Sequence, residues 1–250
     1  MLPASDRDIL NLRHAAAMGG RSPGRTGSGE HMTIAGWIAV ALVFAAVVVL
    51  GWRALARRTT LPCPPAFIWM LENRAMERVA GPGLLFDRAG VTPGMHVLDA
   101  GCGPGRLTLP LAERVGEHGS VLAVDLQEGM LSRLRARMQE HGITRVRTLQ
   151  AALGGGTLPK RAFDRALLVT VLGEIPDRVA ALQEIRDSLK PGGILSVTEV
   201  FPDPHFQRRA TVRRLAQQAG FEARQTFGNW RAHTTNFARA AEDAIGRPGR

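Results

Sequence analysis

The chain has 250 residues, of which 45% are hydrophobic, so it can bury one substantial core in one or two domains. Its formal net charge of +10 is carried almost wholly by arginine and favours anionic surfaces, such as phospholipid head groups or nucleic acid. Two cysteines, Cys63 and Cys102, are too few for a disulfide framework or a metal cluster, which favours a reducing compartment and predicts no metal site.

The first 52 residues divide into two segments of opposite character. Residues 1–32 are polar and rich in glycine, serine and arginine, which predicts disorder, and Met32 offers an alternative start for translation. Residues 33–52 contain no charge and as a helix would span about 30 Å, the thickness of a hydrocarbon core, so they predict a transmembrane helix. A cleaved signal peptide is disfavoured because the run has no small-residue cleavage site, and a buried core helix because it has no polar edge.

Basic residues follow this apolar segment. Arg53, Arg57 and Arg58 come after it, and no acidic residue follows until Glu72. The positive-inside rule therefore predicts a single-pass membrane protein with its C-terminal part on the cytoplasmic side, the arginines facing anionic lipid. The remaining chain is predicted to form a basic, proline-rich linker over 53–65, a globular domain over 66–239 and a flexible tail over 240–250.

Short β-branched runs alternate with helical periods through the globular domain. Strands are predicted over 95–100, 120–124, 145–150, 164–171 and 194–200. The helical stripes between them predict an α/β fold, in which a parallel sheet is covered by helices on both faces. Two further strands, over 221–227 and 231–237, flank a Gly-Asn turn and predict an antiparallel pair at one edge.

A glycine-rich turn follows the first of these strands. His96 to Gly105 read HVLDAGCGPG, a strand that leads into a D-x-G-x-G-x-G turn and then a helix, where backbone N–H groups can approach a ligand closely. Arg106 stands where a dinucleotide fingerprint would have its third glycine. Asp99 favours a cationic amino group, and Asp125, a strand-end carboxylate about twenty residues on, favours the hydroxyls of a ribose. This pair fits S-adenosylmethionine better than NAD.

Four motifs in order make the sequence resemble the class I S-adenosylmethionine-dependent methyltransferases, closest to the branch with the ubiquinone and menaquinone biosynthesis enzymes. They are HVLDAGCGPG, VLAVDLQEGML, the Phe163-Asp164 pair and LKPGG at 189–193. The resemblance covers residues 84–228. It implies a Rossmann-like seven-stranded sheet of order 3-2-1-4-5-7-6, with strand 7 antiparallel and helices on both faces.

The resemblance also implies a cofactor site for S-adenosylmethionine. Its methionyl end would lie on Asp99, Gly101, Gly103 and Gly105, and its ribose on Asp125 with Leu126 beside it. Family members commonly carry an acidic residue for the adenine after strand 3, but this chain has Gln150-Ala151-Ala152 there. Gln150 and Ala151 are therefore the candidates for the adenine, and Thr170 completes the predicted site.

Candidates for a catalytic base are few. Methyl transfer from a sulfonium depends mainly on positioning, so no fixed base is required. Any base would lie at the C-terminal ends of strands 4 and 5, which points to Glu199, His205 and above all Glu174 in the loop after strand 4. Asp164 and Cys102 are interpreted as structural residues.

An acceptor dissolved in the bilayer would explain a membrane tether, so a small lipophilic acceptor, either a quinone precursor or a lipid, is the first hypothesis. Nucleic acid is disfavoured despite the charge, because the Asp/Asn-Pro-Pro-aromatic turn of amino-group DNA methylases is missing after strand 4 and aromatic residues make up only 5% of the chain. Two alternatives stay open: an anchored S-adenosylmethionine-binding scaffold without catalysis, and a methyltransferase of a soluble small molecule or a protein side chain.

Overall fold

The structure, a computed structural model, describes residues 33–59 and 74–239 of the chain. The predictions for the disordered segment 1–32, for residues 60–65 of the linker and for the tail 240–250 lie outside the described residues. The chain divides into two units, Met1–Val47 and Val48–Arg250, and each is described by itself.

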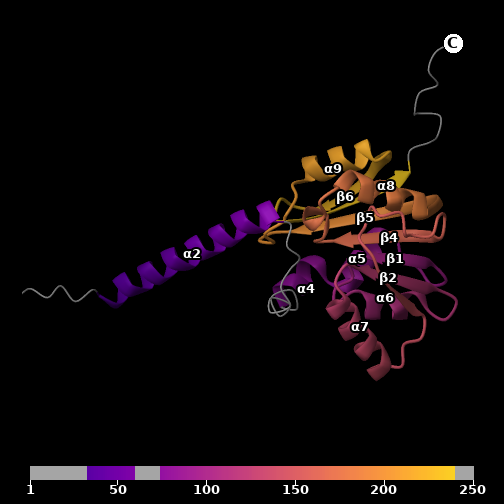
Figure 1. Cartoon of the computed structure of the whole chain (residues 1–250), viewed down its shortest axis with the longest axis horizontal. Coiled ribbons are helices and arrows are strands. Elements are labelled where there is room, and N and C mark those ends of the chain that lie inside the picture. Colours follow the sequence, from indigo (N-terminus) through magenta and orange to yellow (C-terminus); the bar gives the residue numbers. More distant parts are fainter. Residues whose placement is uncertain (1–32, 60–73, 240–250) are drawn as a thin grey trace, which may run out of the picture. The chain divides into compact units, whose positions relative to one another are not determined.

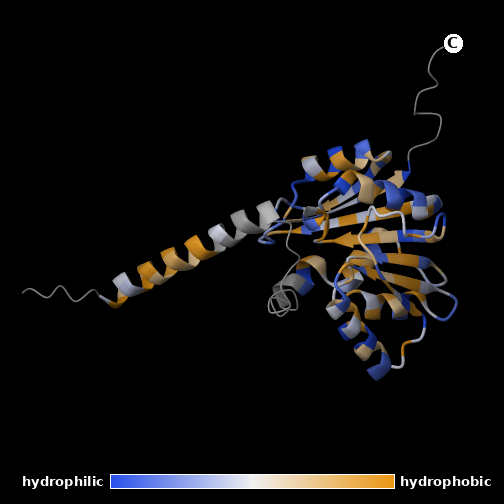
Figure 2. Cartoon of the chain, viewed as in Figure 1, coloured by the Kyte–Doolittle hydropathy of each residue, from blue (hydrophilic) through white to orange (hydrophobic). Residues whose placement is uncertain are grey.

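Helix α2 spans Ile34–Thr59 and forms where the apolar segment predicted a helix. Large apolar side chains in its first turns are exposed, among them Ile34, Trp37 and Phe44. Figure 2 shows that hydrophobic residues predominate in the first part of this helix. The helix continues beyond residue 52 and takes in the arginines that follow the apolar run. In the part of the chain that the structure describes, no helix combines the length and apolar character needed to cross a membrane. The predicted transmembrane span over 33–52 is therefore not confirmed.

The larger unit is built on one seven-stranded sheet (Figure 1). Its strands are β1 (His96–Ala100), β2 (Ser120–Asp125), β3 (Val146–Gln150), β4 (Phe163–Val169), β5 (Leu189–Val200), β6 (Phe221–Gly228) and β7 (Ala232–Arg239). They lie in the order β3-β2-β1-β4-β5-β7-β6, and β7 runs antiparallel to both of its neighbours. The predicted order and the antiparallel strand 7 are confirmed. Strand β5 begins earlier than predicted because Leu189 pairs with Phe163 ahead of a register shift.

Helices cover both faces of this sheet. On one face lie α5 (Pro82–Ala89), α6 (Thr108–Val115) and α7 (Glu128–Glu140), and on the other lie α8 (Arg178–Ser188) and α9 (Arg209–Gln218), as Figure 1 shows. Short helices α4 (Arg74–Ala80) and η2 (Leu172–Glu174) complete the unit. Because side chains alternate along a strand, Val97 of β1 packs into the core on the α6 and α7 face, whereas Leu98 packs into the core on the α8 and α9 face.

Pro110 falls in the first turn of α6, because that helix begins only at Thr108. A proline at this position is compatible with a helix that starts late, and α6 does so. In the first turn of a helix the N–H that proline lacks has no partner within the helix, so the ring does not interrupt the hydrogen bonding.

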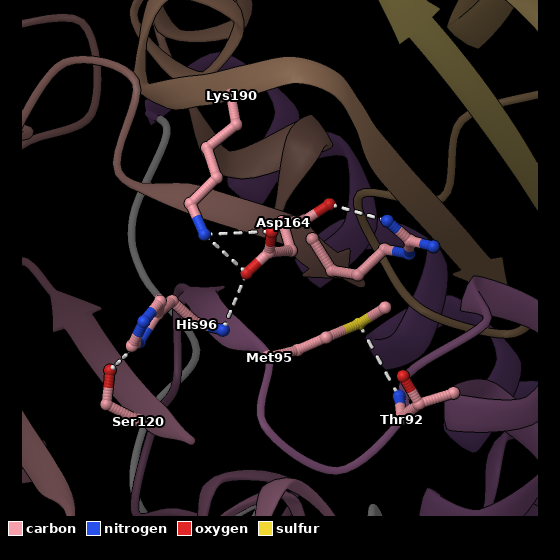
Figure 3. Close-up of polar contacts among 7 residues, drawn as sticks. Thr92, Met95, His96, Ser120, Asp164 and Lys190 are labelled. Carbon is pink, nitrogen blue, oxygen red and sulfur yellow. Dashed lines mark hydrogen bonds and ion pairs between the residues drawn. The ribbon is translucent and has the colours of Figure 1, made fainter. Parts of the chain in front are cut away.

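Asp164 ties three elements together at the end of the sheet where β4 begins (Figure 3). Its carboxylate accepts hydrogen bonds from Lys190 Nζ at 2.8 and 2.9 Å and from the backbone N–H of His96 at 2.8 Å. Partial burial would raise its pKa, but the bonds from Lys190 and His96 outweigh this and hold the pKa of Asp164 below its ordinary value. The contacts support the prediction that Asp164 is a structural residue.

Replacing Asp164 with asparagine is expected to lower the free energy of unfolding by about 1–2 kcal/mol, because a partly exposed charged network is weakened. Chemical denaturation at pH 7 measures this. The depressed pKa means that the contribution is present near neutral pH and disappears as the pH falls through the carboxyl's folded-state pKa. Lys190→Met should lower the free energy of unfolding by a similar amount, and the double variant should lower it by little more than either single variant. Fully additive losses would show that the two side chains do not interact.

Candidate active site

The turn after β1 is held against its neighbours by its backbone. The N–H groups of Gly101 and Cys102 donate to the carbonyl of Val124 at 2.7 and 3.0 Å, which ties the turn to β2. A Cβ atom on Gly101, whose φ is 75°, would lie 2.4 Å from a methyl group of Val171, so only glycine permits this approach. Gly103, with φ of 54°, has open space in the direction of a Cβ atom. A ligand can therefore approach the backbone of Gly103 closely.

Asp125, at the end of β2, organises this turn. Its Oδ2 accepts from the N–H of Gly103 at 2.9 Å, and its Oδ1 accepts from the N–H of Gln127 at 2.8 Å. The carboxylate is half-buried, and each oxygen keeps a further lone pair. It can therefore hold the turn and still accept hydrogen bonds from the hydroxyls of a bound molecule.

A cavity of about 350 Å³, here called the first cavity, opens at the edge of the sheet where β1, β2 and β4 end. Its lining residues are Gly101, Gly103, Pro104, Val124, Asp125, Leu126, Gln127, Met130, Ala151, Ala152, Leu153, Val169, Thr170, Val171, Glu174, Ile175 and Pro176. The predicted residues Gly101, Gly103, Asp125, Leu126, Ala151, Thr170 and Glu174 are all among them. This is the place where open α/β sheets bind ligands.

Asp99 of β1 and Cys102 of the turn are not among the described residues that line the first cavity. Asp99 is buried and its Oδ2 accepts from the hydroxyl of Thr108 at 2.7 Å; burial raises the pKa of Asp99 to about 6, against the opposing effect of that hydrogen bond. Its predicted contact with the cofactor stays a prediction. Burial also raises the pKa of Cys102, so its thiol stays protonated, as expected for a packing residue.

Gly105 and Gln150 are also not among the described residues that line this cavity. A Cβ atom on Gly105 would lie 2.5 Å from Leu134 on α7, so this glycine lets the turn pack against the helix. The amide nitrogen of Gln150 donates to the carbonyl of Leu126 at 3.2 Å. Gln150 thus positions a lining residue, and its predicted contact with adenine stays a prediction.

The end of β4 presents Glu174 through a sharp change of direction. Thr170 has φ of 57°, a left-handed conformation that is strained for a threonine and ends the strand before residue 171, where it was predicted to end. The guanidinium of Arg178 then donates to the carbonyls of Leu172 and Gly173 at 3.2 and 3.1 Å, which fixes η2 in place. Strain at this position is typical of functional sites.

All three predicted candidates for a base meet at this edge. The Nδ1 of His205 lies 3.7 Å from Oε1 of Glu174. Glu199 is buried beside them, and its Oε2 accepts from the N–H of Gln207 at 2.9 Å. Burial raises the pKa of Glu199 to about 8, although the bond from Gln207 opposes the shift. Glu174 is the member of this group that lines the first cavity.

A larger cavity of about 980 Å³, here called the second cavity, lies where β5 ends and β7 begins. Its lining residues are Gly173, Arg178, Phe201, His205, Phe206, Gln207, Arg208, Arg209, Ala210, Thr211, Trp230 and His233. Sequence reasoning missed its aromatic members. The predicted antiparallel pair of final strands could have indicated them, because this pairing brings the β6–β7 turn next to the end of β5. There the N–H of Phe201 donates to the carbonyl of Arg231 at 2.6 Å.

Comparisons with known proteins agree with this geometry. Residues 97–193 match the family model described as a methyltransferase domain. The ubiquinone/menaquinone biosynthesis C-methyltransferase of Shewanella sp. strain ANA-3 is 36% identical over 118 residues, and that of Shewanella oneidensis is 35% identical over the same length. Over residues 97–193 the chain is therefore similar to a methyltransferase domain. The matched segment is 47% of this chain and 47% of each relative, so the chain spans about half the length of these relatives.

Solved structures share the fold of the larger unit. An S-adenosylmethionine-dependent methyltransferase from Aquifex aeolicus aligns with a TM-score of 0.65 and 22% identity, covering 70% of this chain and 98% of that one. The [4+2]-cyclase SpnF aligns with a TM-score of 0.58 and 19% identity, covering 67% of this chain and 82% of that one. Since SpnF is described as a cyclase, the shared fold by itself does not define a reaction.

The residues of the first cavity fit S-adenosylmethionine, the methyl donor of such domains. Gly103 leaves its backbone open to a close ligand, and Asp125 offers carboxylate lone pairs suited to the hydroxyls of a ribose. Apolar side chains such as Met130, Leu153 and Ile175 offer a surface for an adenine ring. Asp125, Gly101 and Gly103 are the residues that would hold the cofactor.

Proposed function

We propose that this protein is an enzyme that methylates a small, lipophilic acceptor, such as a quinone precursor or a lipid, at the expense of S-adenosylmethionine. One observation carries the proposal: Gly103, whose backbone has open space beside it, and the Asp125 carboxylate that it contacts both line the first cavity. The names of the Shewanella relatives support a quinone-type acceptor.

The bound cofactor would supply an activated methyl group, and the chain would bind, orient and shield the reactants. Asp125 and the glycine turn fix one end of the first cavity, and η2 fixes the other. Glu174 lines this cavity within 3.7 Å of His205, where a carboxylate can orient an acceptor or receive its proton. Its catalytic role belongs to the proposal.

Transfer of labelled methyl groups from S-adenosylmethionine to a total lipid extract, followed by identification of the labelled product, tests the proposed reaction. A labelled lipid or quinone supports it. Cofactor binding without any labelled product would favour an S-adenosylmethionine-binding scaffold without catalysis. Labelling of soluble metabolites or proteins alone would favour a methyltransferase of a soluble small molecule or a protein side chain.

We further propose that the α2 segment holds the enzyme at a membrane. The exposed apolar side chains of its first turns support this, as does the run of arginines after residue 52. Deleting residues 1–60 should leave cofactor affinity unchanged but slow methylation of a long-chain acceptor in vesicles, because enzyme and acceptor no longer share one thin layer. The ratio of that rate to the rate on a short-chain soluble analogue is the quantity to measure. An unchanged ratio would show that the acceptor does not come from the bilayer.

The same proposal places the methyltransferase domain on the cytoplasmic side, following the position of Arg53, Arg57 and Arg58 in the chain. A reporter fused after Arg250 is expected to be active only when it is of a kind that works in the cytoplasm. Activity of a reporter that works only across the membrane would reverse the assignment.

A further inference from the structure

The second cavity adjoins the first one through consecutive residues. Gly173 lines the second cavity and Glu174 lines the first. His205, which lines the second cavity, is 3.7 Å from Glu174 across this boundary. A molecule in the second cavity would therefore lie next to the place where the methyl donor fits.

Aromatic side chains form part of the wall of the second cavity. The rings of Phe201 and Trp230 have centroids 6.2 Å apart, and Phe206 lies edge-on to Phe201 at 6.2 Å. Phe201 and Trp230 are 44% and 68% exposed. Large aromatic faces at the mouth of a cavity favour a planar ring as the ligand.

The charged side chains that line this cavity are arginines. Arg178, Arg208 and Arg209 are among its described lining residues, and none of these lining residues is an aspartate or glutamate. The first turn of α9 also faces it, without an acidic residue and without a side-chain cap from Arg208. The N–H groups of such a turn have no partners within the helix and attract anions.

Two buried polar atoms of the lining residues point to a ligand independently. His233 is 1% exposed, and its Nε2 donates to the carbonyl of Gln207 at 3.0 Å, which leaves Nδ1 as an acceptor. Within the described residues, neither Nδ1 of His233 nor Nε of Arg209 has a hydrogen-bond partner. Buried polar groups are rarely left in this state, so a polar ligand is expected near them.

We infer that the second cavity is the acceptor site and that it takes a planar aromatic acid. The ring would lie against Phe201 and Trp230, and the acidic group would face Arg208, Arg209 and the start of α9. The inference rests on the proposed methyl transfer and narrows its acceptor from lipophilic molecules in general to aromatic anions. The same arginines disfavour cationic amines.

Calorimetry on the full-length protein tests the inference without any turnover. It compares the affinity for 2-naphthoate, an aromatic anion, with the affinity for the uncharged 2-naphthalenemethanol. We expect 2-naphthoate to bind about tenfold more tightly, because the anion gains charge-assisted contacts. Arg208→Gln should remove most of this preference. Arg213→Gln is the matched control, since Arg213 is an exposed arginine of the same helix outside the lining of the cavity, and it should retain the preference.

Each outcome decides between the alternatives. Any of three results would overturn the inference. They are equal affinity for the two probes, an equal loss of the preference for 2-naphthoate in both arginine variants, and displacement of 2-naphthoate by S-adenosylhomocysteine. The same samples are titrated with S-adenosylhomocysteine. Failure of the wild type to bind it would count against the proposed function, whereas cofactor binding without selective binding of the anion would count against the acceptor site alone.

Discussion

The Asp125→Ala variant is expected to bind S-adenosylmethionine about 2–4 kcal/mol more weakly than the wild type, a loss of roughly 30- to 1,000-fold. Two effects combine in this variant. The carboxylate that would accept the ribose hydroxyls is removed, and the N–H groups of Gly103 and Gln127 lose the partner that fixes the glycine turn. Titration calorimetry on the purified full chain measures the change.

Two further variants separate these effects. Asp125→Asn keeps one acceptor oxygen and the size of the side chain, so its affinity should fall between the wild type and the alanine variant. Asp87→Ala removes an exposed carboxylate that pairs with Arg114 away from the first cavity, and it should bind the cofactor normally. Wild-type affinity in Asp125→Ala, or binding of NADH in place of S-adenosylmethionine, would refute the assignment of the site.

The Glu199→Gln variant should become more stable relative to the wild type as the pH rises from 5 to 8. Burial raises the pKa of Glu199 to about 8, so between its ordinary value of 4.5 and 8 the folded chain holds a proton that the unfolded chain releases. Wild-type stability from this group is complete below pH 4.5 and declines as the pH approaches 8. The glutamine side chain does not titrate, so the variant lacks this pH dependence. Between pH 5 and pH 8 the free energy of unfolding of the wild type should therefore fall by about 2–4 kcal/mol relative to that of the variant.

Urea unfolding of both proteins at pH 5 and pH 8 measures this difference. Asp99, whose pKa is also raised, is present in both chains, so its contribution cancels. Glu140→Gln, at the exposed end of α7, is the control and should follow the wild type at both pH values. Parallel pH dependence in the wild type and Glu199→Gln would show that Glu199 titrates as it does in the unfolded chain.

The sheet could be predicted from the sequence because each strand is a short apolar run between turn residues, and because the motifs define the connections. The late start of α6 could be read from Pro110 for a similarly local reason. Gly101, Gly103 and Asp125 were found because a glycine-rich turn after one strand and a carboxylate at the end of the next form a recognisable pattern, and they lie together in the first cavity.

What the sequence left open depends on the tertiary arrangement. Asp99 is buried against Thr108, a contact between a strand and the helix after it that no local pattern specifies. The second cavity joins residues from Gly173 to His233, and their proximity follows from the antiparallel pairing of β5 and β7. The elevated pKa of Glu199 likewise arises from burial that is set by distant segments.

The antiparallel strand β7 has a consequence for how such an enzyme can diversify. Residues that line the first cavity end at Pro176, whereas most of those that line the second cavity come after residue 200. The match to the methyltransferase family model ends at residue 193, between these two sets. Exchange of the segment after β5 could therefore alter which molecule is modified while the donor-binding half of the gene is inherited unchanged. A chimera joined within β5 would carry one parent's donor chemistry and the other parent's choice of acceptor.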